Sequence, residues 1–174
     1  MNTVFFSTDY RNQCGDPKDD PGGEQLRWLA TQLQDATAKG AKVWLVYHIP
    51  YGIDAYNSVI SKGGNTVEKV NSLWQPGYTK NFLALLDQYR DTILAMLAGH
   101  THMDYFRLGP KNNTGRPAPF LLVTPGISPI FGNNPGLHIL SYNRSRFSLL
   151  DYSAHRLDLA AGPRRSGKRN IVFP

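Results

Sequence analysis

Apolar positions recur along the chain with two different periods, and together they predict an α/β fold. Residues 24–39 and residues 78–90 repeat apolar side chains three or four positions apart, which predicts two amphipathic helices. The faces expected to point inward consist of Leu26, Leu29, Leu33 and Ala36 in the first helix and of Phe82, Leu85, Leu86 and Tyr89 in the second. Short apolar runs at residues 2–8, 42–47 and 93–98 predict buried strands. An order of strand, helix and strand favours parallel pairing through a crossover.

The second half of the sequence predicts mostly strands. We expect strands at residues 103–108, 120–123 and 137–142, and a final hairpin over residues 146–159. The sheet should therefore be mixed, with a parallel part that carries a site at the carboxyl ends of its strands. Residues 49–77 show no periodic pattern, and such a long connection in a compact domain is typically functional or a lid.

Composition and charge limit the class of protein and the extent of its domain. The chain has 174 residues, of which 41% are hydrophobic, and this is typical of one globular domain. No apolar run approaches the roughly 20 residues that cross a bilayer, and residues 1–6 do not resemble a signal peptide. We predict a domain over residues 1–160 and a solvated basic tail over residues 161–174. The basic residues of this tail lie within residues 164–169, and no aromatic residue lies among them. Since nucleic-acid bases stack on aromatic side chains, there is no strong case for nucleic-acid binding.

Three of the five histidines come directly after predicted buried strands. His48 follows the second apolar run, and His100 and His102 follow the third. Side chains at the carboxyl ends of strands point into a cleft, and a neutral imidazole is a common zinc ligand. A His-x-His pair also occurs in cupins and amidohydrolases, but no cupin-like glutamate follows His102 and the chain is too short for an amidohydrolase barrel. We therefore predict that these three histidines bind metal.

Four stretches carry a resemblance to a known family. Residues 47–52 read Tyr-His-Ile-Pro-Tyr-Gly, and residues 99–106 read Gly-His-Thr-His-Met-Asp-Tyr-Phe. Residues 20–29 begin Asp-Pro-Gly and end Trp-Leu, and residues 127–136 contain Ser-Pro and then Asn-Pro-Gly. In this order, over about residues 2–160, they resemble the acid-sphingomyelinase-like phosphodiesterases of the calcineurin-like metallophosphoesterase superfamily.

This resemblance implies a fold, a reaction and cofactors. The fold would be the C-terminal half of a four-layer αββα sandwich, and the substrate would be a phosphodiester or phosphomonoester. The family uses two divalent metal ions, zinc in this branch, so His48 and His100 would bind one ion and His102 the other. Members are often secreted or periplasmic, and the location of this chain stays open.

The resemblance covers only part of the family's site. We interpret the chain as lacking the family's N-terminal Asp-x-His, Gly-Asp-x-x-Asp and Gly-Asn-His motifs. It would then be a hydrolase fragment that depends on a missing N-terminal half and holds one metal ion or none by itself. The alternative is a non-catalytic module that binds a metal, a phosphorylated ligand or a protein partner on the same scaffold.

Three further residues are candidates outside the predicted metal set. Asp104 is either a partner that orients a ligand histidine or a solvated strand residue. Asp54 and Tyr56 lie in the long loop and are candidates for the wall of a substrate cleft. His138 and His155 fall in late predicted strands, without glycine or acidic neighbours, and are expected to be structural.

Overall fold

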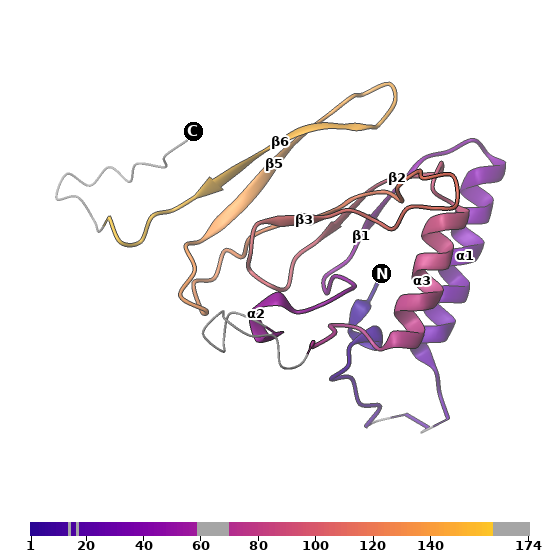
Figure 1. The fold of residues 1–174 in the computed structure, drawn as a ribbon, viewed down its shortest axis with the longest axis horizontal. Coiled ribbons are helices and arrows are strands. Elements are labelled where there is room, and N and C mark those ends of the chain that lie inside the picture. Colours follow the sequence, from indigo (N-terminus) through magenta and orange to yellow (C-terminus); the bar gives the residue numbers. More distant parts are fainter. Residues whose placement is uncertain (14, 17, 59–69, 162–174) are drawn as a thin grey trace.

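A four-stranded mixed sheet backed by two helices forms the main body of the chain (Figure 1). This computed structural model describes residues 1–13, 15–16, 18–58 and 70–161. The strand order is β1-β2-β4-β3, in which β1, β2 and β4 run parallel and β3 runs antiparallel to β4. The strands are β1 Val43–Val46, β2 Ile93–Ala98, β3 Tyr105–Arg107 and β4 Leu121–Val123. The predicted α/β class and the mixed sheet are confirmed.

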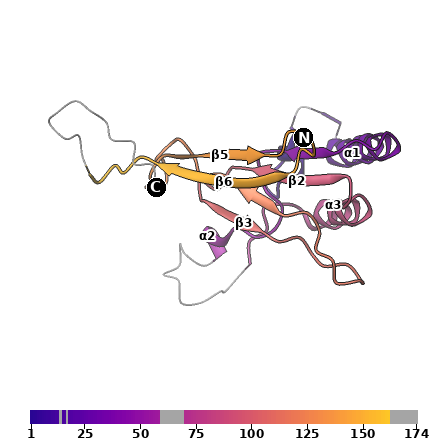
Figure 2. The same cartoon turned by 90° about the horizontal axis from the view of Figure 1, so that it is seen from above.

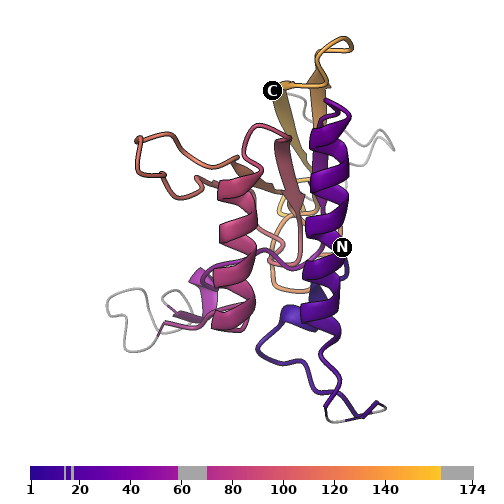
Figure 3. The ribbon, with the colours of Figure 1, turned by 90° about the vertical axis from the view of Figure 1, so that its right-hand side faces the viewer.

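Two helices lie side by side along one face of this sheet (Figure 3). They are α1 Pro21–Ala38 and α3 Pro76–Gln88, so each begins two or three residues before the predicted start. A proline occupies the first position of each helix, where its missing N–H costs nothing because that position has no intrahelical acceptor. The predicted inward faces are confirmed by the burial of Leu29 and Leu33 in α1 and of Phe82 and Leu86 in α3.

Strand register decides which side chains meet these helices. Leu45, Met96 and Leu121 are aligned across β1, β2 and β4, and all three are buried in the core with the helices. On the opposite face, Val46 and Phe106 remain 61% and 60% exposed. The described residues therefore form one helical layer on one mixed sheet, which is compatible with part of a metallophosphoesterase domain; that this part is half of a four-layer sandwich stays a prediction.

A separate hairpin follows the sheet and extends beside it (Figure 2). Its strands are β5 Gly136–Tyr142 and β6 Leu149–Arg156, which pair antiparallel. The prediction of a hairpin within residues 146–159 is wrong, because that stretch holds only the second strand. The turn lies earlier, where the side chain of Asn143 accepts bonds from the N–H groups of Ser145 and Arg146.

The first residues form a helical turn instead of the strand predicted over residues 2–8. The 3₁₀ helix η1, Thr3–Phe6, buries Thr3 and Phe6, which lie three positions apart and thus on one side of the turn. Val4, which an inward-facing strand pattern would bury, is 45% exposed. A short apolar run does not distinguish these two structures by itself.

Two sequence predictions fall partly outside the described residues. The long loop contains one short helix, α2 Ala55–Ser58, and residues 59–69 are not described. The predicted basic tail coincides with residues 162–174, which also lie outside the described part of the chain. Within that part, no helix has the length and apolar character required to cross a membrane.

Candidate functional site

His48 and His100 meet at the carboxyl ends of β1 and β2. The ladder between the strands continues past their ends, as the N–H of Tyr47 donates to Leu97 O (3.1 Å) and the N–H of Gly99 donates to His48 O (3.0 Å). Nδ1 of His100 then lies 3.3 Å from Nε2 of His48, and the two rings meet edge to face. The parallel pairing of two strands 50 residues apart in the chain thus creates the histidine pair.

The backbone that follows His48 is fixed by buried groups from two other segments. The N–H of Ile49 donates to Thr3 Oγ1 (2.8 Å), and the indole N–H of Trp74 donates to Ile49 O (3.0 Å). Thr3 and Trp74 are 1% and 0% exposed. These bonds fix the backbone direction directly after His48 and thereby the position of its side chain in the site.

The loop that carries the other two histidines has an unusual backbone. His100 and His102 have φ angles of 76° and 56°, in the left-handed region that glycine normally occupies. Such a conformation costs about 1–3 kcal/mol for each non-glycine residue, and it persists only when the surroundings impose it. Backbone strain of this kind concentrates at functional sites, which agrees with a ligand role for these residues.

His102 is oriented by a backbone carbonyl from another loop. Its Nδ1 lies 3.1 Å from Ser128 O, and since a carbonyl only accepts, Nδ1 carries a proton; in the neutral ring, Nε2 is then the nitrogen with the lone pair. A hydrogen bond of this type typically orients a metal-binding histidine. The ring packs against Phe131 and directly against Gly126, where a Cβ would lie 2.5 Å from Cγ of His102.

A cavity of 430 Å³ lies beside these histidines and includes two further predicted residues. Asp54 and Tyr56 line it together with His100 and His102, so the structure places both near the predicted metal ligands. Asp54 also caps α2, since its carboxylate accepts bonds from the backbone N–H and the side-chain amide of Asn57. The remaining lining residues are Asn57, Thr101, Met103, Phe131, Gly132 and Asn133.

Two polar atoms in this lining are buried without a hydrogen-bond partner. They are Oγ1 of Thr101 and Oδ1 of Asn133. Buried polar groups are normally paired, so these two oxygens are suited to a ligand that supplies their hydrogen-bond partners. Met103 and Phe131 give the same cavity an apolar wall.

The structure pairs Asp104 with His138. Their Oδ1 and Nε2 atoms are 3.0 Å apart, and the His138 side chain is only 4% exposed. Asp104 therefore orients a histidine, but one that was expected to be structural. The sequence alone could not predict this contact, because the two residues are 34 positions apart and share no local pattern.

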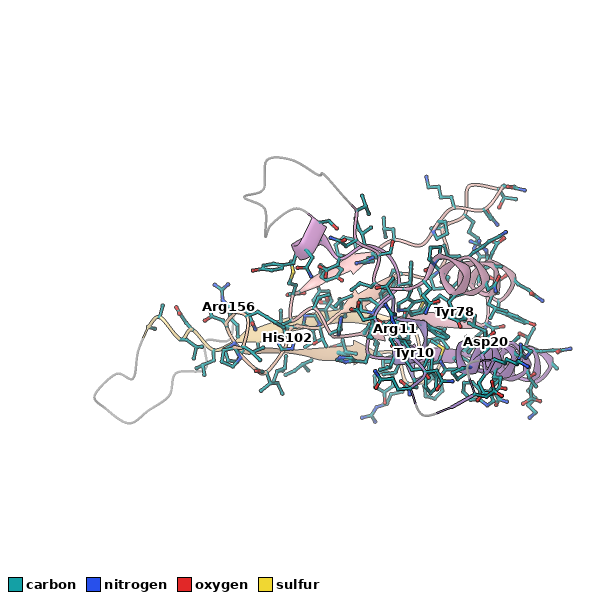
Figure 4. All side chains as sticks on the ribbon, turned by 90° about the horizontal axis from the view of Figure 1, so that it is seen from below. Tyr10, Arg11, Asp20, Tyr78, His102 and Arg156 are labelled. Atoms are coloured by element: carbon teal, nitrogen blue, oxygen red, sulfur yellow. The ribbon has the colours of Figure 1, made fainter. Side chains whose placement is uncertain are left out.

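A second cavity, of 520 Å³, adjoins the same histidine loop. Its lining includes His102, Asp104, His155 and Arg156, so His102 borders both cavities. His102 and Arg156 lie at the same end of the molecule in Figure 4.

Electrostatics favour the neutral form of His100. Burial is the larger cause, and the neighbouring His48 the next, of a pKa of His100 below its ordinary value. Its imidazole is therefore neutral at physiological pH, with a lone pair available for a ligand.

The pair fits a metal ion in spacing but not in number of ligands. Two nitrogens bound at roughly 2.0–2.1 Å to one tetrahedral ion lie about 3.3–3.4 Å apart, which matches the distance between His48 and His100. Among the described residues, however, no group of three or more His, Cys, Asp or Glu side chains is arranged to hold an ion. The predicted ligand roles of His48, His100 and His102 stay predictions.

The expectation that the chain lacks a Gly-Asp-x-x-Asp motif is wrong as a statement about its sequence. Residues 15–19 read Gly-Asp-Pro-Lys-Asp, which matches Gly-Asp-x-x-Asp. In the structure Asp16 and Asp19 belong to the loop before α1, where Asp16 accepts from the N–H of Lys18 and Asp19 accepts from the N–H of Asp16. These carboxylates therefore serve a local turn.

Comparison with known proteins identifies the relatives of the chain. No family model matches it. Sphingomyelinase phosphodiesterase C of Dictyostelium discoideum is 31% identical over 164 residues, which are 87% of this chain and 33% of that protein. Acid sphingomyelinase-like phosphodiesterase 3b of Mus musculus is 31% identical over 170 residues, which are 91% of this chain and 34% of that protein. The homologues of this chain are acid-sphingomyelinase-like phosphodiesterases.

The resemblance predicted from the four motif stretches is thereby confirmed. The human cyclic GMP-AMP phosphodiesterase SMPDL3A is a further phosphodiesterase homologue, 26% identical over 148 residues. The chain spans about a third of the length of the curated phosphodiesterases it matches.

Proposed function

We propose that this chain contributes part of the two-metal centre of a phosphodiesterase. The observation that carries the proposal is the His48–His100 pair, whose nitrogens are spaced for one tetrahedral ion at the carboxyl end of a parallel sheet. His102, with Nε2 unprotonated, would serve a second ion. Zinc suits these imidazole ligands, and bound ions would supply an activated water and offset the charge of the phosphate.

The residues around the pair support a substrate role for the cavity of 430 Å³. A phosphodiester beside His100 would place one ester group against the wall that contains Met103 and Phe131. The hydroxyl of Thr101 would donate to a phosphate oxygen, and Oδ1 of Asn133 would accept a bond from an N–H or O–H group of the esterified alcohol. We therefore propose a phosphodiester as the substrate class, with Asp54 and Tyr56 on the wall of its cleft.

The three histidines do not complete such a centre. Neutral imidazoles provide no negative charge to balance two divalent ions, so carboxylate ligands are required as well. We propose that these come from the part of the phosphodiesterase fold that this chain does not represent, and that the present sheet is one half of a four-layer sandwich. The chain alone would then hold one ion, between His48 and His100, and its activity would depend on the other half.

Metal titration tests the first part of this proposal. We expect Co²⁺ or Zn²⁺ to bind the purified chain, and the substitution His100→Ala to weaken that binding by at least tenfold. His155→Ala is the matched control, because His155 lies within strand β6, apart from the histidine pair, and hydrogen-bonds to Ser153 in the hairpin. Equal affinity in the wild type and His100→Ala would contradict the assignment.

An activity assay tests the second part. Hydrolysis of bis(4-nitrophenyl) phosphate is measured with the chain alone and with the unmatched portion of the Dictyostelium homologue added. We expect turnover to rise on addition and to disappear in His100→Ala. Metal binding without turnover in either arrangement would favour the alternative, a non-catalytic binding module.

A further inference from the structure

Arg107 connects two segments that the sheet would otherwise keep apart. It lies on β3, at the edge of the sheet opposite to β1. Its guanidinium nevertheless reaches the loop that follows β1, where Nη1 donates to Tyr51 O and Nη2 donates to Ile53 O, each at 2.6 Å. Nη2 also donates to the hydroxyl of Tyr105 at 3.1 Å, so the guanidinium is bound both by the loop carbonyls and by a residue of its own strand.

The loop is shaped to receive this guanidinium. Gly52, between the two acceptor carbonyls, has a φ of 99°, and this left-handed residue turns both carbonyls toward Arg107. A Cβ at Gly52 would occupy the position of Nη1 of Arg107. Only glycine therefore allows both the backbone conformation and the approach of the guanidinium at this point.

The clamped segment leads directly into residues that line the cleft next to the histidine pair. The carbonyls of Tyr51 and Ile53 lie between His48 and Asp54 in the chain, and Asp54 lines the cleft and caps the short helix that carries Tyr56. A second group of lining residues, residues 100–103, comes shortly before β3, the strand of Arg107. One side chain thus joins the two segments that carry these lining residues.

We propose that Arg107 is a positioning residue, which sets the distance between the His48 loop and the His100–His102 loop. This inference rests on the proposed function only for its catalytic consequence, because the clamp itself is a property of the loop. Lysine would not replace it, since a single ammonium lacks the planar fork that donates to two carbonyls at once. Two other bonds in the described part of this loop, from Leu73 N–H to Gly52 O and from Asp54 N–H to Asn71 O, do not involve residues 100–103.

Amide hydrogen exchange tests the clamp independently of activity. In Arg107→Met we expect residues 51–58 to exchange at least tenfold faster, and in Arg107→Lys we expect a large part of this effect. Arg90→Met is the matched control, because Arg90 also donates to two backbone carbonyls, Asp87 O and Arg116 O, but lies before β2 at the other end of the sheet. Faster exchange in this segment to the same degree in Arg90→Met, or unchanged exchange in Arg107→Met, would overturn the proposal.

Co²⁺ affinity gives the functional readout. A residue that positions ligand loops typically changes metal affinity by about 10–100-fold when it is lost. We expect a loss in this range for Arg107→Met, partial recovery when free guanidinium is added at millimolar concentration, and wild-type affinity for Arg90→Met. Unchanged Co²⁺ affinity in Arg107→Met would refute the positioning role. Failure of the wild type to bind Co²⁺ would instead refute the proposed function, and hydrogen exchange would still decide whether Arg107 clamps the loop.

Discussion

A single hydrogen bond ties the start of α1 to the first turn of α3, and its removal should have a measurable and pH-dependent cost. The hydroxyl of Tyr78 donates to Asp20 Oδ1 at 2.6 Å, and the same oxygen accepts the N–H of Gly23 at 2.8 Å as the cap of α1. Figure 4 shows Asp20 and Tyr78 together at the helices, away from His102. Loss of this bond should therefore lower the stability of the two helices that pack on the sheet and leave the histidine site unchanged.

The size of the effect follows from the chemistry of the bond. A hydrogen bond to a charged acceptor contributes about 1.5–3 kcal/mol when it is sheltered. Asp20 is exposed, so screening by water reduces the expected cost of Tyr78→Phe to about 1 kcal/mol. Asp20→Ala also removes the helix cap and should cost about 2 kcal/mol. In the double variant we expect the two costs to overlap by about 1 kcal/mol.

The pH dependence distinguishes this bond from simple packing. The bond to Asp20 raises the pKa of Tyr78 to about 12, so its contribution is complete below the ordinary tyrosine pKa of about 10 and is lost as the pH rises toward 12. The bonds from Tyr78 and then from Gly23 lower the pKa of Asp20, so that contribution is present above about pH 4 and is lost as the pH falls through the lowered pKa.

Urea unfolding of the wild type and Tyr78→Phe, followed by circular dichroism, measures the difference. We expect it to be constant between about pH 5 and 10 and to shrink on either side. A difference that stays the same from pH 7 to 11.5 would refute the assigned bond. So would equal costs of Asp20→Ala in the wild-type and Tyr78→Phe backgrounds.

Two other substitutions test the site and the core. Gly126→Ala places a methyl group against the ring of His102, so we expect a loss of about 1–3 kcal/mol from overpacking and a shift of the His102 ring signals in NMR spectra. Gly77→Ala, whose Cβ would meet no atom within 4 Å, is the control and should be neutral or stabilise α3 by about 0.5–1 kcal/mol; a similar loss in both would argue against the contact. Phe82→Ala empties a fully buried position and should lower the free energy of unfolding by about 3–5 kcal/mol in urea titrations, whereas a loss below about 1 kcal/mol would show that the core is not packed as described.

The helices and the parallel strands could be predicted from periodicity because local burial produces it. Residues 93–98 were expected as a strand and form one over the same bounds. Both helices were placed to within three residues, with their inward faces correctly assigned. The positions of His48, His100 and His102 at strand ends followed from the same pattern, since a ligand after a buried strand lies at the edge of the sheet.

The errors arise where a local pattern fits more than one structure. The run of residues 2–8 suits a buried strand and equally a 3₁₀ turn, and contacts of Phe6 with Trp74 and Tyr78 favour the turn. The last hairpin was misplaced because the pattern shows apolar stretches but not which of them pair.

By itself, the sequence determined the α/β class, the element order, the family resemblance and the histidines that follow strands, because these depend on short-range periodicity and on motif letters. Only the tertiary structure decided that His48 and His100 touch while His102 turns to Ser128, and that Asp104 pairs with His138. It also brought Arg107 to the loop of Tyr51 and Ile53 across the sheet. These contacts join residues 26 to 56 positions apart, and such distances are set by how strands pair and loops cross, which no local pattern specifies.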